Sequence, residues 1–437
     1  MKQTVQRPLK HGPERGRWWS SHHARRKVVA GLLLFVVSLV LVVGWIYYQE
    51  TPLREALRLE GAQQHENALR WAEFYLQHNP TDVHGLALKA RLLTVTPAMI
   101  GPQQAVEIFD RIGAASIDDL HAFGVAYMRL SQWSRSVPLL QRVVELDPQN
   151  ALAWYELTTC RMRLGLLNEA LESASKYTEL SGFQARGLLL QAAIQNDMSN
   201  VEEAANLHAE ILKLTPDAKN LMIEPGSFFV QYGTLLGMIG RNEESVAMLE
   251  RAAVLEPRPY VYVNLGTAHS AAGDVTKAVG AWRFALNLDP GNPQAREALA
   301  RISLEDGHPE EGLRLMKGLD QNPAMASTTA YLFQRLYVVQ GDLEKAQQWE
   351  QRVAKLRKEE ERQNSINQFL VRAPRSYWAG VIRAYQYAKD QNWKQAGDLL
   401  KEVVEIDDSD PFVQKLVQAV NERGPLPAID ELPLRHF

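Results

Sequence analysis

The chain contains a single cysteine, Cys160, among its 437 residues. One cysteine can form neither an intramolecular disulfide nor a multi-cysteine metal site, so both are excluded within the chain. The formal net charge is −3 and charged residues make up 23% of the chain. This composition lacks the basic excess of a nucleic-acid-binding protein. We expect Cys160 to lie in a helix and to be buried as a small hydrophobic residue.

Catalytic motifs are also missing from the sequence. His65-Glu66 starts like the zinc-protease motif HExxH, but no histidine follows at the required offset. The chain has no GxxxxGK[ST] phosphate loop and no GxGxxG after a strand, and its 11 histidines are scattered. We therefore predict a non-enzymatic protein with no metal, no cofactor, no small-molecule substrate and no nucleic-acid partner.

Small residues recur along the chain with an almost constant spacing. Seven of them are separated by steps of 34, 34, 41, 33, 34 and 34 residues. Such a period is typical of stacked structural repeats and not of one globular core. With its extensions at both ends, the series consists of Ala68, Ala105, Ser136, Ala170, Ala204, Ser245, Ala278, Gly312, Ala346 and Ala396.

Glycines and prolines repeat with the same period. Prolines such as Pro148 and Pro290 stand twelve residues after the small residue. Glycine permits the left-handed conformation that ends a first helix, and proline stops a second one. Each unit is therefore predicted to be two helices that approach closely at the small residue, and such pairs must stack to bury their apolar faces. The glycines, five residues before the small residue, are Gly165, Gly240, Gly273, Gly307 and Gly341.

Two units carry a particularly complete set of apolar and small positions. The first is Tyr262, Leu265, Gly266, His269, Ala278, Trp282, Ala285 and Pro290, and the second is Leu120, Phe123, Gly124, Tyr127, Ser136, Leu140, Val143 and Pro148. These sets resemble the W-x2-L-G-x2-Y…A-x3-F…P pattern of tetratricopeptide repeats. Another copy departs from the pattern at Arg161. The resemblance implies an all-α, right-handed solenoid of stacked helix-turn-helix repeats, with about ten units over residues 49–423.

The resemblance also implies a groove on the concave face, lined by the first helices, that receives a protein or peptide partner. The expected groove residues are mostly aromatic and apolar, as interface cores are. The lysine- and asparagine-rich clamp with which some family members hold a terminal carboxylate is not apparent. Our candidate partner-binding residues are His121, Met128, Tyr155, Met162, Asn196, Tyr260, Tyr331, Arg335, Trp378 and Tyr385.

Residues Val28–Tyr48 form an uncharged, apolar run that is long enough, at about 30 Å, to cross a bilayer as a helix. A basic segment, residues 1–27, precedes this run, and no basic excess follows it. The positive-inside rule therefore predicts a signal-anchor helix with a cytoplasmic N-terminus and extracytoplasmic repeats, most simply in a bacterial periplasm. A cleavable signal peptide is the alternative, but bulky aromatic residues stand where a cleavage site needs small ones.

The remaining chain divides by changes in the period. Extra residues occur near 219–225 and near 361–376. The charged run Lys355–Arg362 before the second of them is expected to be a solvated helix extension. Asp410-Pro411 should open a capping helix over residues 410–423 that Gly424 closes, and the proline-containing tail 424–437 should be extended.

Two functions remain open at this stage. The first is a membrane-anchored scaffold or assembly factor that binds a partner segment on the extracytoplasmic side. The second is a cytoplasm-facing membrane adaptor or regulatory protein with the same repeats, which would require the charge rule to be violated.

Overall fold

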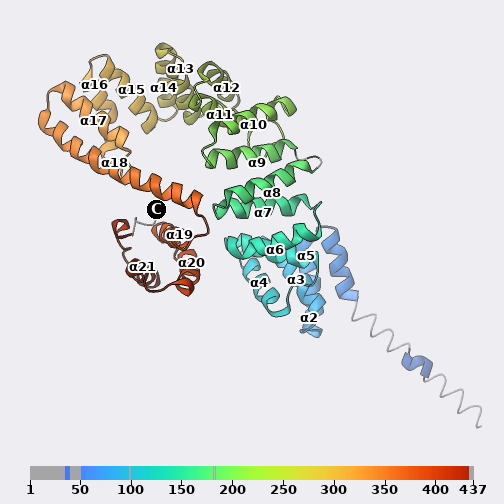
Figure 1. The fold of residues 1–437 in the computed structure, drawn as a ribbon. Helices are drawn as coiled ribbons and strands as arrows, with labels where there is room; N and C mark the ends of the chain where they lie inside the picture. Colours follow the sequence, from blue (N-terminus) through green and yellow to red (C-terminus); the bar gives the residue numbers. More distant parts are fainter. Residues whose placement is uncertain (1–34, 40–50, 98–99, 181, 183, 433–437) are drawn as a thin grey trace, which may run out of the picture. The chain divides into compact units, whose positions relative to one another are not determined.

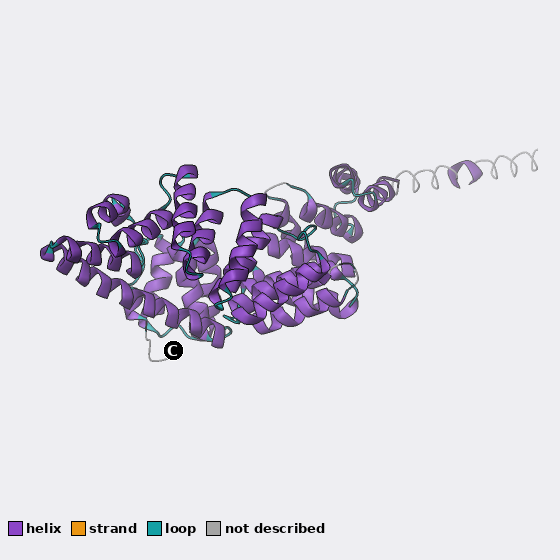
Figure 2. Ribbon diagram, turned by 90° about the horizontal axis from the view of Figure 1, so that it is seen from above, coloured by secondary structure: helices purple, strands orange, loops and turns teal. Residues whose placement is uncertain are grey.

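The computed structural model describes residues 35–39, 51–97, 100–180, 182 and 184–432. Within these ranges every regular element is an α-helix or a short 3-10 helix, as the ribbons in Figures 1 and 2 show. The expectation of an all-α chain is therefore confirmed for the described residues. The chain divides into two compact units, residues 1–126 and residues 127–437.

The first unit contains a helix over residues 51–61, followed by α2 (His65–His78), α3 (Val83–Val95), α4 (Gly101–Ile112) and most of α5 (Ile117–Arg129). Its core is formed by small and aliphatic side chains from the first three of these helices. An ion-pair network adds to this packing, because the Arg91 guanidinium lies 2.9 Å from Glu60 and 2.6 Å from Asp119. The core residues are Ala56, Leu59, Ala68, Ala72, Leu88 and Leu92.

The second unit is a succession of helix pairs in which each first helix packs on the helix that follows it (Figure 1). Apart from α16 and α18, the helices are 12 to 14 residues long. They are α6 (Trp133–Leu146), α7 (Ala151–Arg163), α8 (Leu167–Glu179), α9 (Gln184–Asp197), α10 (Val201–Leu214), α11 (Pro225–Met238), α12 (Asn242–Leu255), α13 (Pro259–Ala271), α14 (Val275–Leu288), α15 (Pro293–Glu305), α16 (Pro309–Met316), α17 (Ser327–Gln340), α18 (Leu343–Arg372), α19 (Tyr377–Lys389), α20 (Trp393–Ile406) and α21 (Pro411–Glu422).

The small residues that define the period are all buried early in a second helix. Ala170, Ala204, Ala278 and Ala396 have no exposed surface. The close approach of the helices also involves first-helix glycines, since a Cβ on Gly233 would lie 2.7 Å from Leu249 Cγ. The prediction that the period marks the contact between paired helices is therefore confirmed.

The turn inside nearly every pair adopts the left-handed conformation expected for glycine. Gly165, Gly240, Gly273, Gly307 and Gly341 have φ values from 68° to 87°. The same turn position is also left-handed in four pairs that lack glycine, where a polar residue has φ between 58° and 64°. These polar residues are Gln63, Ser131, Ser199 and Gln391. The α3–α4 pair is the exception, because Ile100 at this position has φ of −92°.

Helix α18 contains the extra residues that the sequence placed near 361–376. It has 30 residues and runs without a break from Leu343 to Arg372, so the extra length extends a repeat helix. Val353 belongs to the core formed with α15, α16 and α17, whereas Ile366 belongs to the C-terminal core. One continuous helix therefore joins two separate apolar clusters. In the earlier extra segment, residues 219–224 lie in the loop between α10 and α11, and Pro225 is the first residue of α11.

The C-terminal end of the repeats differs from our expectation in two respects. Asp410 caps α21 as expected, but Arg423 takes the left-handed closing position with φ of 50°, one residue before Gly424. The described part of the tail is packed and not simply extended, since Leu432 is buried in the C-terminal core. Apolar side chains in the tail explain this, because burying them removes their surface from water.

The predicted membrane segment lies almost entirely outside the described residues. Only residues 35–39 of Val28–Tyr48 are described, and they are helical. No helix in the described part of the chain combines the length and the apolar character that a membrane span requires.

Candidate functional site

The ten candidate groove residues all lie on first helices, namely α5, α7, α9, α13, α17 and α19. Their environments differ, however. Asn196, Tyr260, Tyr331 and Arg335 are exposed, while the other six are half-buried. The half-buried members are His121, Met128, Tyr155, Met162, Trp378 and Tyr385.

Four of the half-buried residues serve internal packing, and Tyr385 is one of them because it packs against the C-terminal core. The Tyr155 ring lies 5.8 Å from the Tyr177 ring on α8. Met162 packs against the core shared by α8 and α9, and Trp378 packs against the C-terminal core. These side chains contribute to the cohesion of neighbouring helices, which leaves Tyr260 as the exposed aromatic candidate in the best-matched repeat.

Tyr260 lies at a cleft of about 600 Å³ that we name the α13–α15 cleft. It is formed by α13 and α15, two consecutive first helices, together with two residues of α14. The cleft combines apolar side chains with hydroxyl, amide and charged groups. Its lining residues are Tyr260, Val263, Asn264, Thr267, Ser270, Ala271, Val275, Trp282, Gln294, Glu297, Ala298, Arg301, Ile302 and Glu305.

Internal hydrogen bonds fix part of this lining. The Trp282 indole donates to the Val263 carbonyl over 3.3 Å, and the Asn264 amide donates to the Tyr260 carbonyl over 2.9 Å. Burial raises the pKa of the Tyr260 phenol, which therefore stays neutral and able to donate a hydrogen bond at physiological pH. A cleft that combines apolar side chains with hydrogen-bonding groups suits a peptide segment, whose backbone needs hydrogen-bond partners.

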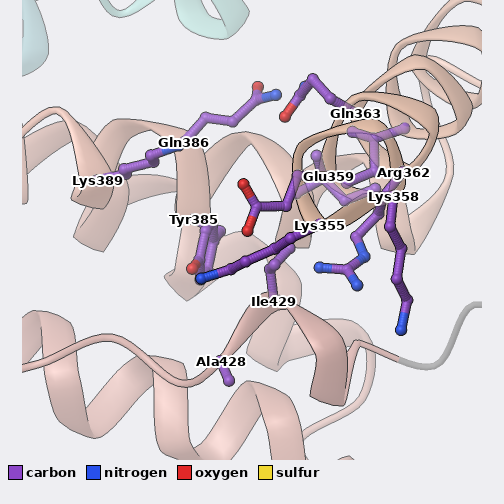
Figure 3. A pocket seen from close by; sticks show the side chains of 12 residues that line it. Lys355, Lys358, Glu359, Arg362, Gln363, Tyr385, Gln386, Lys389, Ala428 and Ile429 are labelled. Carbon is purple, nitrogen blue, oxygen red and sulfur yellow. The ribbon is translucent and has the colours of Figure 1, made fainter. Parts of the chain in front are cut away.

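A second cleft, of about 500 Å³, lies between α18, α19 and the folded-back tail (Figure 3). We name it the basic cleft because four of its lining residues are cationic and one is acidic. Figure 3 shows Lys355 and Glu359 directed toward Tyr385. The lining residues are Lys355, Lys358, Glu359, Arg362, Gln363, Ile366, Ile382, Tyr385, Gln386, Lys389, Ala428 and Ile429.

Apolar side chains of the C-terminal core line one side of the basic cleft. Ile366 and Ile382 are buried in the C-terminal core, and Ile429 packs against the same core. Tyr385 is fixed by stacking on Phe412, with 6.0 Å between the ring centroids. The sequence indicated the charged run on α18, but it gave no sign that the tail would fold back and complete a cleft beside that run.

Cys160 is buried as predicted, and its thiol lies 3.4 Å from the Ser136 hydroxyl. Burial raises the pKa of the Cys160 thiol to about 11, so the thiol stays protonated and is a poor nucleophile at neutral pH. In the residues that the structure describes, no group of histidine, cysteine and acidic side chains could hold a metal ion.

Comparison with known proteins supports the repeat assignment. A family model described as tetratricopeptide repeat matches residues 121–185 and 263–326. Outside the matched residues, the buried period and the left-handed turns continue the same pattern of helix pairs through the other described repeats.

Two curated proteins are similar to about half of the chain. They are anaphase-promoting complex subunit 7 from Mus musculus and from Homo sapiens, each 21% identical over 213 residues. The match covers 48% of this chain and 36% of each relative, so the chain aligns with only about a third of their length.

Solved structures of repeat proteins also align with parts of the chain. The C-terminal part of a TPR repeat-containing protein from Cytophaga hutchinsonii is 14% identical, covering 56% of this chain and 99% of that one with a TM-score of 0.46. YrrB, described as a TPR protein with an unusual peptide-binding site, is 14% identical, with coverages of 44% and 96% and a TM-score of 0.37. MamA from Desulfovibrio magneticus RS-1 is 17% identical, with coverages of 40% and 97% and a TM-score of 0.36.

Proposed function

We propose that this protein is an interaction scaffold that binds a peptide or a partner protein's segment in the α13–α15 cleft. The observation that carries the proposal is the cleft itself, which joins neighbouring repeats and presents Tyr260 beside Val263 and Ile302. Tyrosine is enriched among the residues that dominate interface energies, because it offers a large apolar surface together with a hydroxyl group. Repeat solenoids use such first-helix surfaces for binding. A relative that aligns with 48% of this chain is by name a subunit of a complex.

The chemistry of the cleft indicates what kind of segment would bind. Arg301 is a cation between two carboxylates, Glu297 and Glu305, so the lining has no strong excess of one charge. Glu297 also accepts a hydrogen bond from the Thr329 hydroxyl over 2.9 Å, which fixes one of these carboxylates. We therefore propose a mixed polar and apolar segment whose apolar side chain contacts Tyr260 and Val263.

Crosslinking tests this proposal in cells. A photoreactive amino acid at Asn264, inside the cleft, should capture a defined protein repeatedly. The same group at Val254, which is 84% exposed on the second helix α12, serves as the matched control and should not capture that protein. Equal capture from both positions would show that binding is not specific to the cleft.

We further propose that Val28–Tyr48 tethers the scaffold to a membrane, with residues 1–27 in the cytoplasm and the repeats outside it. The support is the sequence alone, namely the apolar run and the basic excess on one side of it. A reporter that is active only after export, fused behind Phe437, should be active. Activity of a cytoplasm-only reporter at that position would instead favour the adaptor that faces the cytoplasm.

A further inference from the structure

The basic cleft is built from parts that the repeat pattern does not require. It depends on the lengthened α18, on the C-terminal half of α19 and on the tail residues Ala428 and Ile429. Four cationic side chains and one carboxylate line it, which leaves an excess of three positive charges in a cleft of about 500 Å³. We propose that this cleft is a second binding site, distinct from the α13–α15 cleft, that takes an acidic segment of a partner protein carrying an apolar side chain.

The lysines of the basic cleft favour an anionic occupant. Lys355, Lys358 and Lys389 are exposed, and none of them forms an ion pair with a carboxylate in the described residues, whereas Lys345 on the same helix pairs with Asp342 over 2.8 Å. Like charges repel one another across a cleft, so their positive potential favours an anionic occupant. Glu359 is the one lining group that opposes such an occupant.

The apolar side chains of the basic cleft favour a peptide over a free anion. Tyr385 and Ile429 line the cleft, are half-buried and pack against the C-terminal core, in which Ile366 and Ile382 are buried. A free inorganic anion would leave the exposed parts of Tyr385 and Ile429 uncovered, while a peptide can cover them with one apolar side chain. A flat anionic membrane would meet the lysines at the rim, but it would not fill the cleft. The arrangement therefore favours a peptide.

The dimensions limit the length of the segment. The lining on α18 runs from Lys355 to Ile366, which is about 16 Å at 1.5 Å per residue. An extended chain covers this distance with about five residues, at roughly 3.3 Å each. The matching motif is therefore short, with acidic residues on both sides of one aliphatic or aromatic residue.

The test uses the full chain and a short fluorescein-labelled peptide that places one leucine between two pairs of glutamates. Fluorescence anisotropy should show saturable binding that weakens about tenfold as salt is raised well above physiological strength. A peptide with glutamines in place of the glutamates, and one with alanine in place of the leucine, should each bind at least tenfold more weakly. Equal binding of the glutamine peptide would overturn the proposal.

Variants then assign the binding to the cleft. The pair Lys355→Glu and Lys358→Glu should weaken the acidic peptide at least tenfold, while Lys213→Glu, an exposed lysine of α10, is the matched control and should have no effect. Glu359→Gln should strengthen binding about threefold, because it removes the opposing charge. A misfolded variant cannot mimic this gain, and an unchanged affinity in both the Lys and the Glu variants would contradict the assignment.

Vesicles of phosphatidylcholine and phosphatidylglycerol test whether the basic cleft binds a lipid surface instead of a peptide. The chain could sediment with these vesicles, lose that sedimentation in the Lys355→Glu and Lys358→Glu double variant, and show no binding of the peptide. This outcome would mean that the cleft binds a lipid surface, and it would overturn the proposal. These binding experiments test the basic cleft, whereas crosslinking from Asn264 tests the α13–α15 cleft. Either proposal can therefore fail without the other.

Discussion

At the scale of single residues, the turn inside nearly every helix pair imposes one conformation on whichever residue occupies it. Gly273 has φ of 85°, and Gln391 occupies the corresponding position of a later repeat with φ of 60°. A side chain in this left-handed region costs roughly 1–2 kcal/mol because its Cβ crowds the backbone. The glycine series was readable from the sequence, but the polar residues in the same register were not, since nothing in their chemistry marks that turn.

Replacing Gln391 by glycine should therefore stabilise the C-terminal repeats. Gln391 is exposed, so the change removes backbone strain without removing a buried contact. We expect a gain of about 0.5–1 kcal/mol in the free energy of unfolding, measured by urea denaturation. Gly273→Ala is the reciprocal variant and should lose about 1 kcal/mol or more. A loss of stability in Gln391→Gly together with a gain in Gly273→Ala would show that strain at the turn does not limit stability.

His208 makes the free energy of unfolding depend on pH. Its ring is 3% exposed between α10 and α11, it stacks on Tyr232, and its Nδ1 donates to the Ala204 carbonyl over 2.8 Å. Burial lowers the pKa of His208 in the folded protein. The unfolded chain, with a histidine pKa of about 6.5, thus binds the proton first, and stability is lost as the pH falls below that value.

The comparison variant is His208→Gln, which keeps a hydrogen-bond donor but does not titrate. We expect wild-type stability to fall relative to His208→Gln between about pH 6.5 and pH 5, and the difference to be constant above pH 7. Parallel stability curves for the two proteins over this range would contradict a buried neutral histidine.

At the scale of single elements, α18 is the helix that departs most from the repeat pattern. Its first half completes a pair with α17, where the Trp349 ring stacks on Phe333 at 4.3 Å. The Glu360 carboxylate accepts a hydrogen bond from the Ser327 backbone over 2.7 Å, and Ile366 then enters the C-terminal core. In a solenoid whose units interact with their neighbours, such a helix should couple the unfolding of two repeats.

Asn364→Pro tests this coupling. Proline in the middle of α18 removes a backbone hydrogen bond and clashes with the preceding turn, at a cost of about 3 kcal/mol. We expect the C-terminal repeats to unfold in a separate, earlier transition, seen by hydrogen exchange over α19, α20 and α21. Asn364→Ala is the control for losing the exposed side chain, and it should leave protection unchanged. Equal protection in the proline variant would show that the two clusters fold independently of α18.

The contact within a helix pair offers a second test at this scale. Ala170 and Ala278 have no exposed surface and sit where the paired helices approach. Tryptophan at either position should overpack the contact and lower stability by several kcal/mol, with a large drop in melting temperature. Unchanged melting of both variants would show that the period does not mark the helix contact.

At the scale of the whole molecule, the repeat period could be predicted because it depends on residues whose chemistry is local, such as small side chains, glycines and prolines. The binding surface could be predicted only in part. Tyr155 and Tyr260 were both expected in the groove, but Tyr155 meets Tyr177 on the next helix, whereas Tyr260 borders an open cleft. The difference depends on which side chains neighbouring helices bring together, and one helix's sequence does not specify that.

The packing of the C-terminal tail also could not be predicted from the sequence. Its three prolines suggested an extended chain, yet Leu426, Ile429 and Leu432 pack against the C-terminal core. These apolar residues have no helical or strand period, so their burial depends on a surface formed by distant helices. The basic cleft follows from that packing, which is why the sequence indicated its charges but not its shape.

The most direct measurement of the central claim compares Tyr260→Ala with Tyr155→Ala, using calorimetric affinity for the partner captured from Asn264 and melting temperature on the same samples. Tyr260→Ala should weaken binding by about 1–3 kcal/mol, roughly five- to 150-fold, with little change in melting temperature. Tyr155→Ala should lower the melting temperature and keep its affinity in the folded fraction. Unchanged affinity in Tyr260→Ala would contradict the claim that the α13–α15 cleft is the binding site.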